Sequence, residues 1–429
     1  MTRLVNSLIA LISSIVLLVS GNAFLTTLLA IRLSNDSVSA DTIGWVLVCY
    51  SVGFVLGTLY VQKIIAGVGH IRAFAVFAAT AAVTALMYPM AISMLLWAAL
   101  RILSGFSIAG VLVVIESWFS SRATNANRGS LFAIYQIVFY VAAASGQLIV
   151  NIGDPTNFLP FSLAAILLTL ALIPLSLTRM EAPRINKTRR ISIVTLARES
   201  FSGVSGALTG GALISSFYAL GPVYAALVGL DVARTSIFMA SAVFAAMLLA
   251  WPIGRLCDRF DRRHLMFWVA LVTAVIAAVI GLLGVTHLPL LTLLVALSIG
   301  LSATLYPTAV AITNDRMDTT LIVAASATLL LTYGIGSMIG PIVMAELINL
   351  LGPKGLFLGN AGFLLLLAAI TGYHINQSED VPVEEQEHFV STIPEVSPVL
   401  AKLDPRNDQF HASPEAIEME EEQKRTRNG

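Results

Sequence analysis

Long apolar stretches separated by short polar connections recur along the first 376 residues of the chain. Each stretch has about 20 residues, enough for an α-helix to cross a hydrocarbon core of roughly 30 Å. The apolar positions run on continuously and do not alternate with polar ones, as they would in the strands of a transmembrane barrel. Because lipid offers no hydrogen-bond partner to a backbone group, these stretches must be helical. The pattern predicts an all-α membrane protein.

Twelve such stretches can be delimited, and one long basic connection, 179–203, divides them into two sets of six. Two equal sets joined by a single linker predict two pseudo-symmetric six-helix bundles. The polar loops at 57–74 and 254–263 follow the second stretch of each set and support an internal repeat. The predicted spans are 5–32, 42–65, 73–94, 96–118, 129–150, 158–178, 204–228, 235–256, 265–286, 289–312, 321–348 and 355–376.

The same pattern predicts four parts of the chain: an N-terminal bundle (1–178), a cytoplasmic linker (179–203), a C-terminal bundle (204–376) and a tail (377–429). The basic linker is predicted to lie on the anionic surface of the inner leaflet. The tail holds 13 acidic and 5 basic residues and lacks an apolar period. Such a composition is typical of a solvated segment, so a disordered acidic cytoplasmic tail is predicted.

Charge is scarce and unevenly placed. Only 12% of the residues are charged and the mean hydropathy is +0.84, whereas a soluble domain has about 25% charged residues. With the N-terminus in the cytoplasm, 16 Lys and Arg residues before the tail fall in cytoplasmic segments and three, Arg32, Arg234 and Lys354, fall in outer segments. This bias follows the positive-inside rule and predicts that both termini are cytoplasmic.

Several functional classes find no support in the sequence. No phosphate-binding Walker loop is present, and the six histidines show no metal-ligand spacing. The two cysteines, Cys49 and Cys257, form no CxxC pair and are predicted to be unpaired thiols. Burial of nearly the whole chain in lipid leaves no surface for nucleic acid. We therefore expect no enzyme activity, no cofactor and no metal site.

Three charged residues fall inside the predicted spans: Arg101, Glu116 and Glu346. A charge within the membrane is costly and marks a functional candidate. Arg101 suits either an anionic substrate or backbone carbonyls between spans. Glu116 is expected either to form a structural clamp with Arg72 or Arg122, or to take up and release a proton. Glu346 lies near the outer end of its span and is expected to reach water.

Polar and aromatic residues within the apolar spans predict the lining of a central cavity. Gln136 and Tyr140 are four residues apart and therefore share one helical face. Tyrosine is equally common as an anchor at the membrane interface, which is the alternative role for each tyrosine of the set. The predicted substrate-binding residues are Asn22, Arg101, Gln136, Tyr140, Tyr218, Tyr306 and Tyr333.

The decapeptide GRLCDRFDRR (254–263) concentrates charge between two long apolar runs. Gly254 permits close approach of a backbone, and Asp258 can accept hydrogen bonds at a helix N-terminus, predicted to be that of the fifth span near Asn127–Leu131. The arginines can pair with an acid such as Asp315 or hold lipid phosphate, and the alternative is a plain topology anchor. The predicted gating residues are Arg72, Glu116, Gly254, Asp258, Arg259, Arg262, Arg263 and Asp315.

The decapeptide resembles the loop signature of the major facilitator superfamily, and Arg101 with Gly105 resembles that family's Arg-x-x-x-Gly motif. Ala66 and Gly67 depart from the signature in the first-half loop, where Asp-Arg would be expected. Further stretches resemble a bacterial subgroup, the YcaD type. They are Ile115-Glu116-Ser117-Trp118, Arg128-Gly129, Tyr306-Pro307, Tyr333-Gly334, Gly336 and Gly340-Pro341.

The resemblance implies a secondary active transporter of the bacterial inner membrane that moves a small organic solute by alternating access. It also implies a proton gradient as the energy source, so a small-molecule substrate, protons and membrane lipid are the expected partners. The alternative hypothesis is a non-transporting receptor or scaffold that uses the transporter fold and its acidic tail.

Overall fold

The computed structural model describes residues 2–124, 127–177, 191–284, 287–318 and 321–377, with side chains from Leu8 onward, and eight single positions of the tail. This part of the chain forms helices and no strand. The helices are α1 (Thr2–Asn35), α2 (Ala40–Val68), α3 (His70–Met87) with the 3₁₀ turn η1 (Tyr88–Met90), α4 (Met94–Ser121), α5 (Arg128–Ile149), α6 (Leu159–Leu170), α7 (Leu172–Ser176), α8 (Ile193–Glu199), α9 (Phe201–Leu227), α10 (Val232–Cys257), α11 (Arg262–Leu283), α12 (Leu288–Ala303), α13 (Leu305–Asn314), α14 (Ile322–Leu351) and α15 (Lys354–Ile375).

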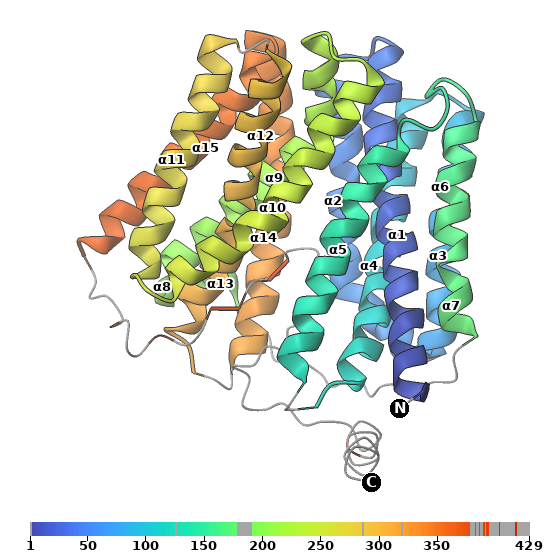
Figure 1. Cartoon of the computed structure of the whole chain (residues 1–429), viewed down its shortest axis with the longest axis horizontal. Coiled ribbons are helices and arrows are strands. Elements are labelled where there is room, and N and C mark those ends of the chain that lie inside the picture. The colour runs from blue at the N-terminus through green and yellow to red at the C-terminus, as the bar shows by residue number, and fades with distance from the viewer. Residues whose placement is uncertain are drawn as a thin grey trace.

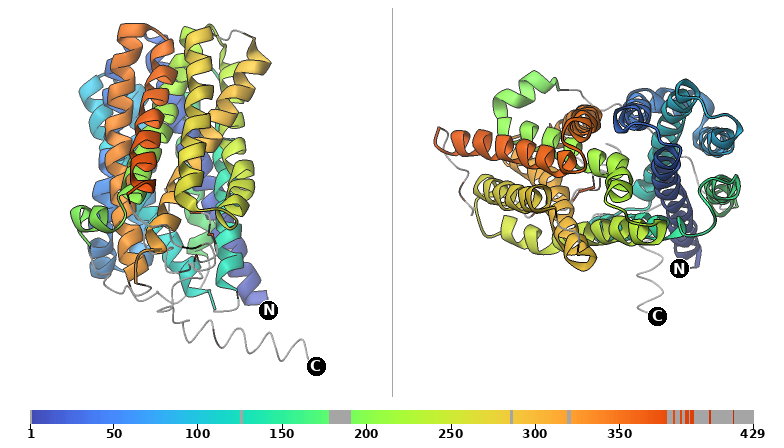
Figure 2. Two further views of the ribbon diagram at one scale, coloured as in Figure 1. Left: turned by 90° about the vertical axis from the view of Figure 1, so that its left-hand side faces the viewer. Right: turned by 90° about the horizontal axis from the view of Figure 1, so that it is seen from above.

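Twelve segments of the described chain are long and apolar enough to cross a membrane, which confirms the predicted all-α membrane protein. Figure 1 shows them as two bundles standing side by side, α1–α7 and α9–α15. The first helix of each bundle packs on the fifth: α1 on α5, and α9 on α14. The view from above in Figure 2 shows the two bundles meeting along a central line. The predicted pair of pseudo-symmetric six-helix bundles is therefore confirmed.

The sixth and tenth spans are each interrupted, which the apolar pattern did not predict. α6 ends at Leu170 and α12 ends at Ala303. Each end lies four residues before a proline, Pro174 or Pro307. A proline ring clashes with the carbonyl of the residue four positions earlier and lacks the N–H that would bond to it. The helical ladder therefore breaks at these positions while the span continues to the other face.

The end of the predicted linker belongs to the C-terminal bundle. Helix α8 begins after Ser192, whose hydroxyl accepts a hydrogen bond from the Thr195 N–H. Leu196 is fully buried in the hydrophobic cluster of that bundle. Span seven therefore starts at Phe201 rather than at 204. The basic residues at 178–190, predicted to lie on the membrane surface, are outside the described residues.

The tail departs from the prediction of a fully solvated segment where the structure describes it. Ile393 is 2% exposed and Leu403 is completely buried, although Ile417 is 46% exposed. The two buried residues belong to the large hydrophobic cluster that contains the core of the N-terminal bundle. Part of the acidic tail thus contacts the membrane domain.

Glycines permit close helix contacts inside each bundle. A Cβ atom placed on Gly105 of α4 would lie 2.1 Å from the backbone oxygen of Tyr50 in α2. A Cβ on Gly146 of α5 would lie 2.5 Å from the Ser20 oxygen in α1, and one on Gly340 of α14 would lie 2.2 Å from the Ala212 oxygen in α9. The last two glycines occupy corresponding positions in the two bundles. In lipid, small residues at such contacts let helix backbones approach each other.

Replacing Gly105 by valine is expected to destabilise the protein, because the added atoms would overlap the α2 backbone. Overpacking of this kind costs about 1–3 kcal/mol. The midpoint of thermal unfolding in detergent should fall below that of the wild type. Gly362→Val is the matched control, since no atom lies within 4 Å of a Cβ at that exposed helical position. Equal midpoints for the two variants would contradict the proposed packing constraint.

Candidate functional site

A central cavity of about 160 Å³ lies where the two bundles face each other. Four helices of the N-terminal bundle (α1, α2, α4 and α5) and two of the C-terminal bundle (α9 and α14) line it. A smaller cavity of about 20 Å³ adjoins it among α5, α9, α10, α12, α13 and α14. Both are lined by Ile214, Tyr218 and Tyr333. The site is thus built from both halves of the chain.

Arg101 of α4 supplies the positive charge of the central cavity. Its side chain is 1% exposed, and its Nη2 donates a hydrogen bond of 3.2 Å to the hydroxyl of Thr26. The guanidinium carbon lies 4.8 Å from the ring centre of Tyr50, within range of a cation–π contact. The Nε and Nη1 atoms have no hydrogen-bond partner within the described part of the chain. No acidic residue is among those that line the cavity.

Asn22 of α1 completes this corner of the cavity. Its amide nitrogen donates to the Tyr50 hydroxyl at 3.0 Å, while its Oδ1 atom is buried and has no hydrogen-bond partner among the described residues. Arg101, Asn22, Thr26 and Tyr50 therefore form a cationic corner with donor groups and an acceptor still available. A ligand that carries a negative charge beside a hydrogen-bond donor would satisfy all of these groups.

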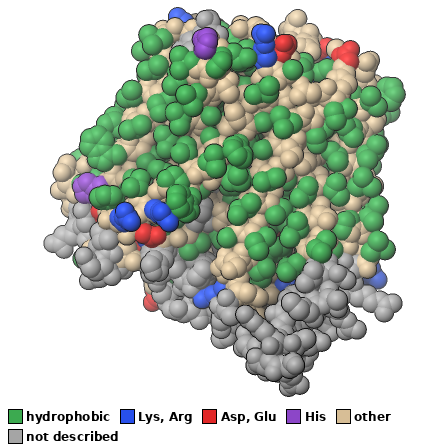
Figure 3. All heavy atoms as spheres, in the orientation of Figure 1, with side chains coloured by type: hydrophobic (Ala, Val, Ile, Leu, Met, Phe, Trp, Pro, Cys, Tyr) green, Lys and Arg blue, Asp and Glu red, His purple; other side chains and the backbone are tan. Residues whose placement is uncertain are grey.

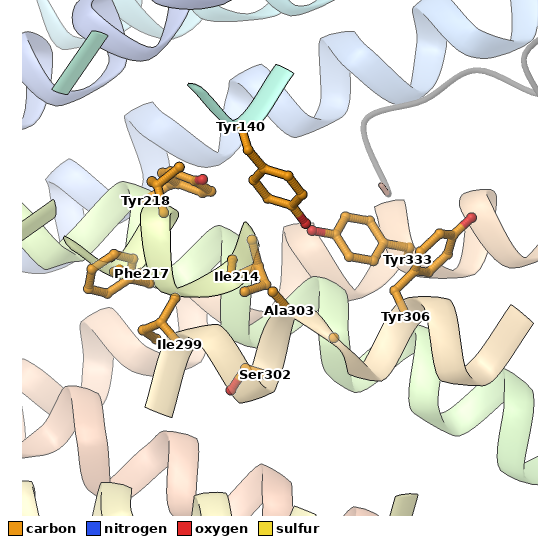
Figure 4. A pocket seen from close by; sticks show the side chains of 13 residues that line it. Tyr140, Ile214, Phe217, Tyr218, Ile299, Ser302, Ala303, Tyr306 and Tyr333 are labelled. Atoms are coloured by element: carbon orange, nitrogen blue, oxygen red, sulfur yellow. The ribbon is translucent and has the colours of Figure 1, made fainter. Parts of the chain in front are cut away.

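Four tyrosines form the aromatic side of the site (Figure 4). Tyr306 and Tyr333 meet edge to face, with ring centres 5.2 Å apart and planes at 71°. Figure 4 shows the hydroxyls of Tyr140 and Tyr333 pointing toward each other, and Tyr218 lies on the same side of the cavity. Because Tyr140 belongs to α5 and Tyr333 to α14, the two bundles meet here through phenol groups.

We call the side of the molecule that holds the N-terminus and the 254–263 loop the near side, at the bottom of Figure 1. On the opposite, far side the two bundles are joined. The Ser236 hydroxyl donates to the Gln147 carbonyl at 2.6 Å and accepts from the Asn151 amide at 3.0 Å. A Cβ on Gly44 would lie 2.7 Å from the Cβ of Ala345. These contacts close the far end of the cavity.

The near-side decapeptide is held mainly within the C-terminal bundle. Arg262 forms the predicted ion pair with Asp315, and both side chains are buried. Asp261 accepts hydrogen bonds of 2.9 Å from the backbone N–H groups of Arg263 and His264, which caps α11. Since α11 and α13 lie in one bundle, the Arg262–Asp315 pair links two elements of the C-terminal bundle.

The contacts of Asp258, Gly254 and Arg259 differ from those that the sequence predicted. Asp258 accepts a hydrogen bond of 2.6 Å from the backbone N–H of tail residue Phe389, not from the start of α5. The atom closest to Gly254 belongs to the ring of Phe389, 2.8 Å from a Cβ placed there, rather than to a backbone. Arg259 is exposed and makes no ion pair with any residue that the structure describes.

Glu116 is completely buried in α4. Its carboxylate accepts a hydrogen bond of 2.7 Å from the hydroxyl of Tyr135 in α5. Of the two predicted clamp partners, Arg72 is exposed and forms no ion pair within the described ranges, whereas Arg122 is buried. The carboxylate therefore links α4 to α5 through a phenol.

Six of the seven predicted substrate-binding residues line the two cavities; Gln136 is buried but lines neither. The sequence interpretation missed α2, which contributes Tyr50, Phe54 and Thr58. Their spacing of four residues places them on one helical face, and that periodicity is the signal that could have found them. No group of three metal-ligating side chains occurs in the described part of the chain.

These features define a multi-pass membrane transporter of a solute: two bundles enclose a ligand-sized cavity that is closed on one side. The family profile described as Major Facilitator Superfamily matches residues 10–317 and 229–410, and the chain belongs to that family.

Curated relatives agree with this assignment. The chain is 31% identical over 363 residues to the uncharacterized MFS-type transporter YcaD of Escherichia fergusonii, which covers 83% of this chain and 93% of the relative. YcaD of Salmonella arizonae is 30% identical over the same length and shares of the two chains. The predicted resemblance to the superfamily and its YcaD type is confirmed.

Solved structures share the fold at low sequence identity. The nucleoside transporter NupG superposes with a TM-score of 0.70 at 17% identity, over 86% of this chain and 98% of that one. A bacterial homologue of the lysosomal transporter Spinster, in an inward-facing and occupied conformation, gives 0.67 at 13% identity, over 89% and 97%. A D-xylose-proton symporter gives 0.62 at 13% identity, over 85% and 96%.

Proposed function

We propose that this protein is a secondary active transporter that carries a small organic anion across the bacterial inner membrane by alternating access, driven by protons. The observation that carries the proposal is the guanidinium of Arg101, buried in the cavity between the bundles with two nitrogens unpartnered. A charge taken out of water is expensive unless an opposite charge compensates it. No residue lining the cavity is acidic, so the ligand is the natural source of the negative charge.

The rest of the lining indicates the body of the ligand. Tyr218, Phe54 and Phe139 present apolar rings to the cavity, and Ile214 and Leu330 add aliphatic surface. Small-ligand sites commonly combine a mostly apolar lining with a few polar groups that fix orientation. We therefore propose an amphipathic anion, a carboxylate attached to an apolar or aromatic body. Its carboxylate would bind Arg101 in a bidentate manner.

The closed far side supports alternating access. Contacts of Ser236 with Gln147 and Asn151, and of Gly44 with Ala345, join the bundles there. By sequence, 16 Lys and Arg residues before the tail fall in the segments predicted to share the N-terminal side of the membrane, and three fall in those on the other side. The positive-inside rule therefore assigns the near side, which holds the N-terminus, to the cytoplasm. The described conformation is then the inward-facing one, with both termini in the cytoplasm.

Glu116 is the residue we assign to proton coupling. Within the described residues it is the only acidic residue that is fully buried, and its carboxylate accepts a hydrogen bond from the Tyr135 hydroxyl. A carboxyl group that moves between a neutral and a charged form can alter the packing of α4 on α5. Since Arg101 lies on the same helix, α4, protonation and anion binding would act on one element.

Carboxylates with apolar bodies should raise the unfolding midpoint of the detergent-solubilised protein, whereas the matching neutral amides should not. Arg101→Gln should weaken carboxylate binding by about 100-fold, because a hydrogen bond to a charged group contributes up to about 3 kcal/mol. Arg101→Lys should keep part of the affinity, and Arg234→Gln, which changes an exposed far-side arginine, should keep all of it. Equal binding of amides and carboxylates would refute an anionic substrate.

A disulfide across the far side should stop transport. In a chain with Cys49→Ala and Cys257→Ala, the pair Asn151→Cys and Ser236→Cys joins two positions whose side chains are already in contact. Oxidation should abolish uptake into proteoliposomes, and reduction should restore it, while each single variant stays active under both conditions. Undiminished uptake by the fully cross-linked protein would show that the bundles do not need to separate there.

Glu116→Gln should separate coupling from binding. The neutral variant should still exchange labelled for unlabelled substrate across a proteoliposome membrane, but an imposed proton gradient should no longer drive accumulation. Glu346→Gln, at an exposed position of α14, is the control and should accumulate substrate normally. Proton-driven accumulation by Glu116→Gln at the wild-type level would remove this residue from the coupling mechanism.

A further inference from the structure

The tail residue Phe389 contacts Asp258 and Gly254, two of the loop residues predicted to take part in gating. Its backbone N–H donates to the Asp258 carboxylate at 2.6 Å. Its ring packs against Gly254, where an added Cβ would lie 2.8 Å from the ring edge. The ring also belongs to the apolar surface of the C-terminal bundle that includes Cys257 and Ile253. A glycine at 254 therefore makes room for the ring.

Other described tail positions pack on a hydrophobic cluster that the two bundles share. Ile393, 2% exposed, is part of this large cluster, which contains residues of both bundles, and Val390 packs against it. Ile393 follows Phe389 by four positions, so the ring that packs on Gly254 is close in sequence to a side chain buried in the shared cluster.

The docked tail and a closed near side need the same groups. In the predicted closed arrangement the Asp258 carboxylate accepts hydrogen bonds at the N-terminus of α5, around Asn127–Leu131. In the described arrangement that carboxylate accepts a hydrogen bond from the N–H of Phe389, and the ring of Phe389 covers Gly254. Docking of the tail and near-side closure therefore exclude each other.

We propose that the near-side surface formed by Gly254, Asp258 and the adjoining apolar residues is a docking site for this chain's own tail, with Phe389 as the anchor. The docked tail holds the transporter open to the cytoplasm and opposes the return to the outward-facing state. The conformational effect rests on the alternating access proposed above; the docking contact itself does not. The anchor combines an apolar ring with a backbone donor, so the site recognises an extended peptide that carries an aromatic side chain.

Labelling of a far-side cysteine tests this proposal without any substrate. Ser236→Cys in the chain with Cys49→Ala and Cys257→Ala places a thiol at a position that is completely buried while the far side is closed. In proteoliposomes that hold the protein right side out, with its far side facing the external solution, a membrane-impermeant maleimide should label this cysteine about tenfold faster when Phe389→Ala is added. Burial of a phenyl ring contributes at least one factor of ten to such an equilibrium.

Matched variants separate undocking from general damage. Phe389→Leu keeps an apolar side chain and should label slowly, as the parent does. Ile417→Ala removes an exposed tail residue and should also label slowly. All variants should unfold in a single cooperative transition, as the parent does, because the anchor lies outside the helix bundles. Equal labelling rates for Phe389→Ala and Ile417→Ala would overturn the docking proposal.

A forced-open variant distinguishes failure of this proposal from failure of alternating access. Gly44→Phe cannot fit against Ala345 and should expose Ser236→Cys by itself. Rapid labelling in Gly44→Phe with slow labelling in Phe389→Ala would reject the tail as a conformational brake and leave alternating access intact. Slow labelling in both would reject alternating access and, with it, the brake.

Discussion

The absence of water around the bundles is the constraint on which the structure depends. In lipid each backbone group must find its partner inside its own helix, so the bundles are packed through surfaces rather than through exposed peptide groups. Packing then requires small residues: Gly105 on the Tyr50 carbonyl, and Gly146 and Gly340 at corresponding contacts in the two bundles. Polar side chains that do not serve helix packing gather where the bundles face each other. The cavity lining is therefore more polar than the helix contacts inside each bundle.

The same constraint applies to Arg101, the residue proposed to bind the substrate. A guanidinium in such a place is tolerated when its hydrogen bonds are made and its charge is compensated. Thr26 and the ring of Tyr50 satisfy only part of it. The Oδ1 atom of Asn22, also without a partner among the described residues, adds an acceptor nearby. A site with both an unused cation and an unused acceptor is preorganised for a ligand and costs little reorganisation on binding.

Sequence reasoning predicted the spans, their pairing into bundles and six of the residues that line the cavities, because these depend on hydrophobicity and on polar residues in apolar surroundings. It failed where three-dimensional direction decides. Gln136 is as polar as Asn22 yet is buried away from both cavities. Arg72 has the charge needed to pair with Glu116, but it is exposed. Pro174 shows a further limit: the apolar run predicted one continuous span although the sequence contains a residue that interrupts helices. The contact of tail residue Phe389 shows another, because no local pattern encodes a contact between distant segments.

The strengths of the contacts are distributed as the proposed alternating-access mechanism requires. The buried Arg262–Asp315 ion pair lies inside one bundle, where breaking it would leave an uncompensated charge and cost roughly 3–5 kcal/mol. Between the bundles, the far side is held by neutral hydrogen bonds of Ser236 and by small apolar contacts, and a neutral hydrogen bond contributes only about 1 kcal/mol. Binding of one charged ligand can offset a few such contacts, so the bundles can separate as rigid bodies while each keeps its internal structure.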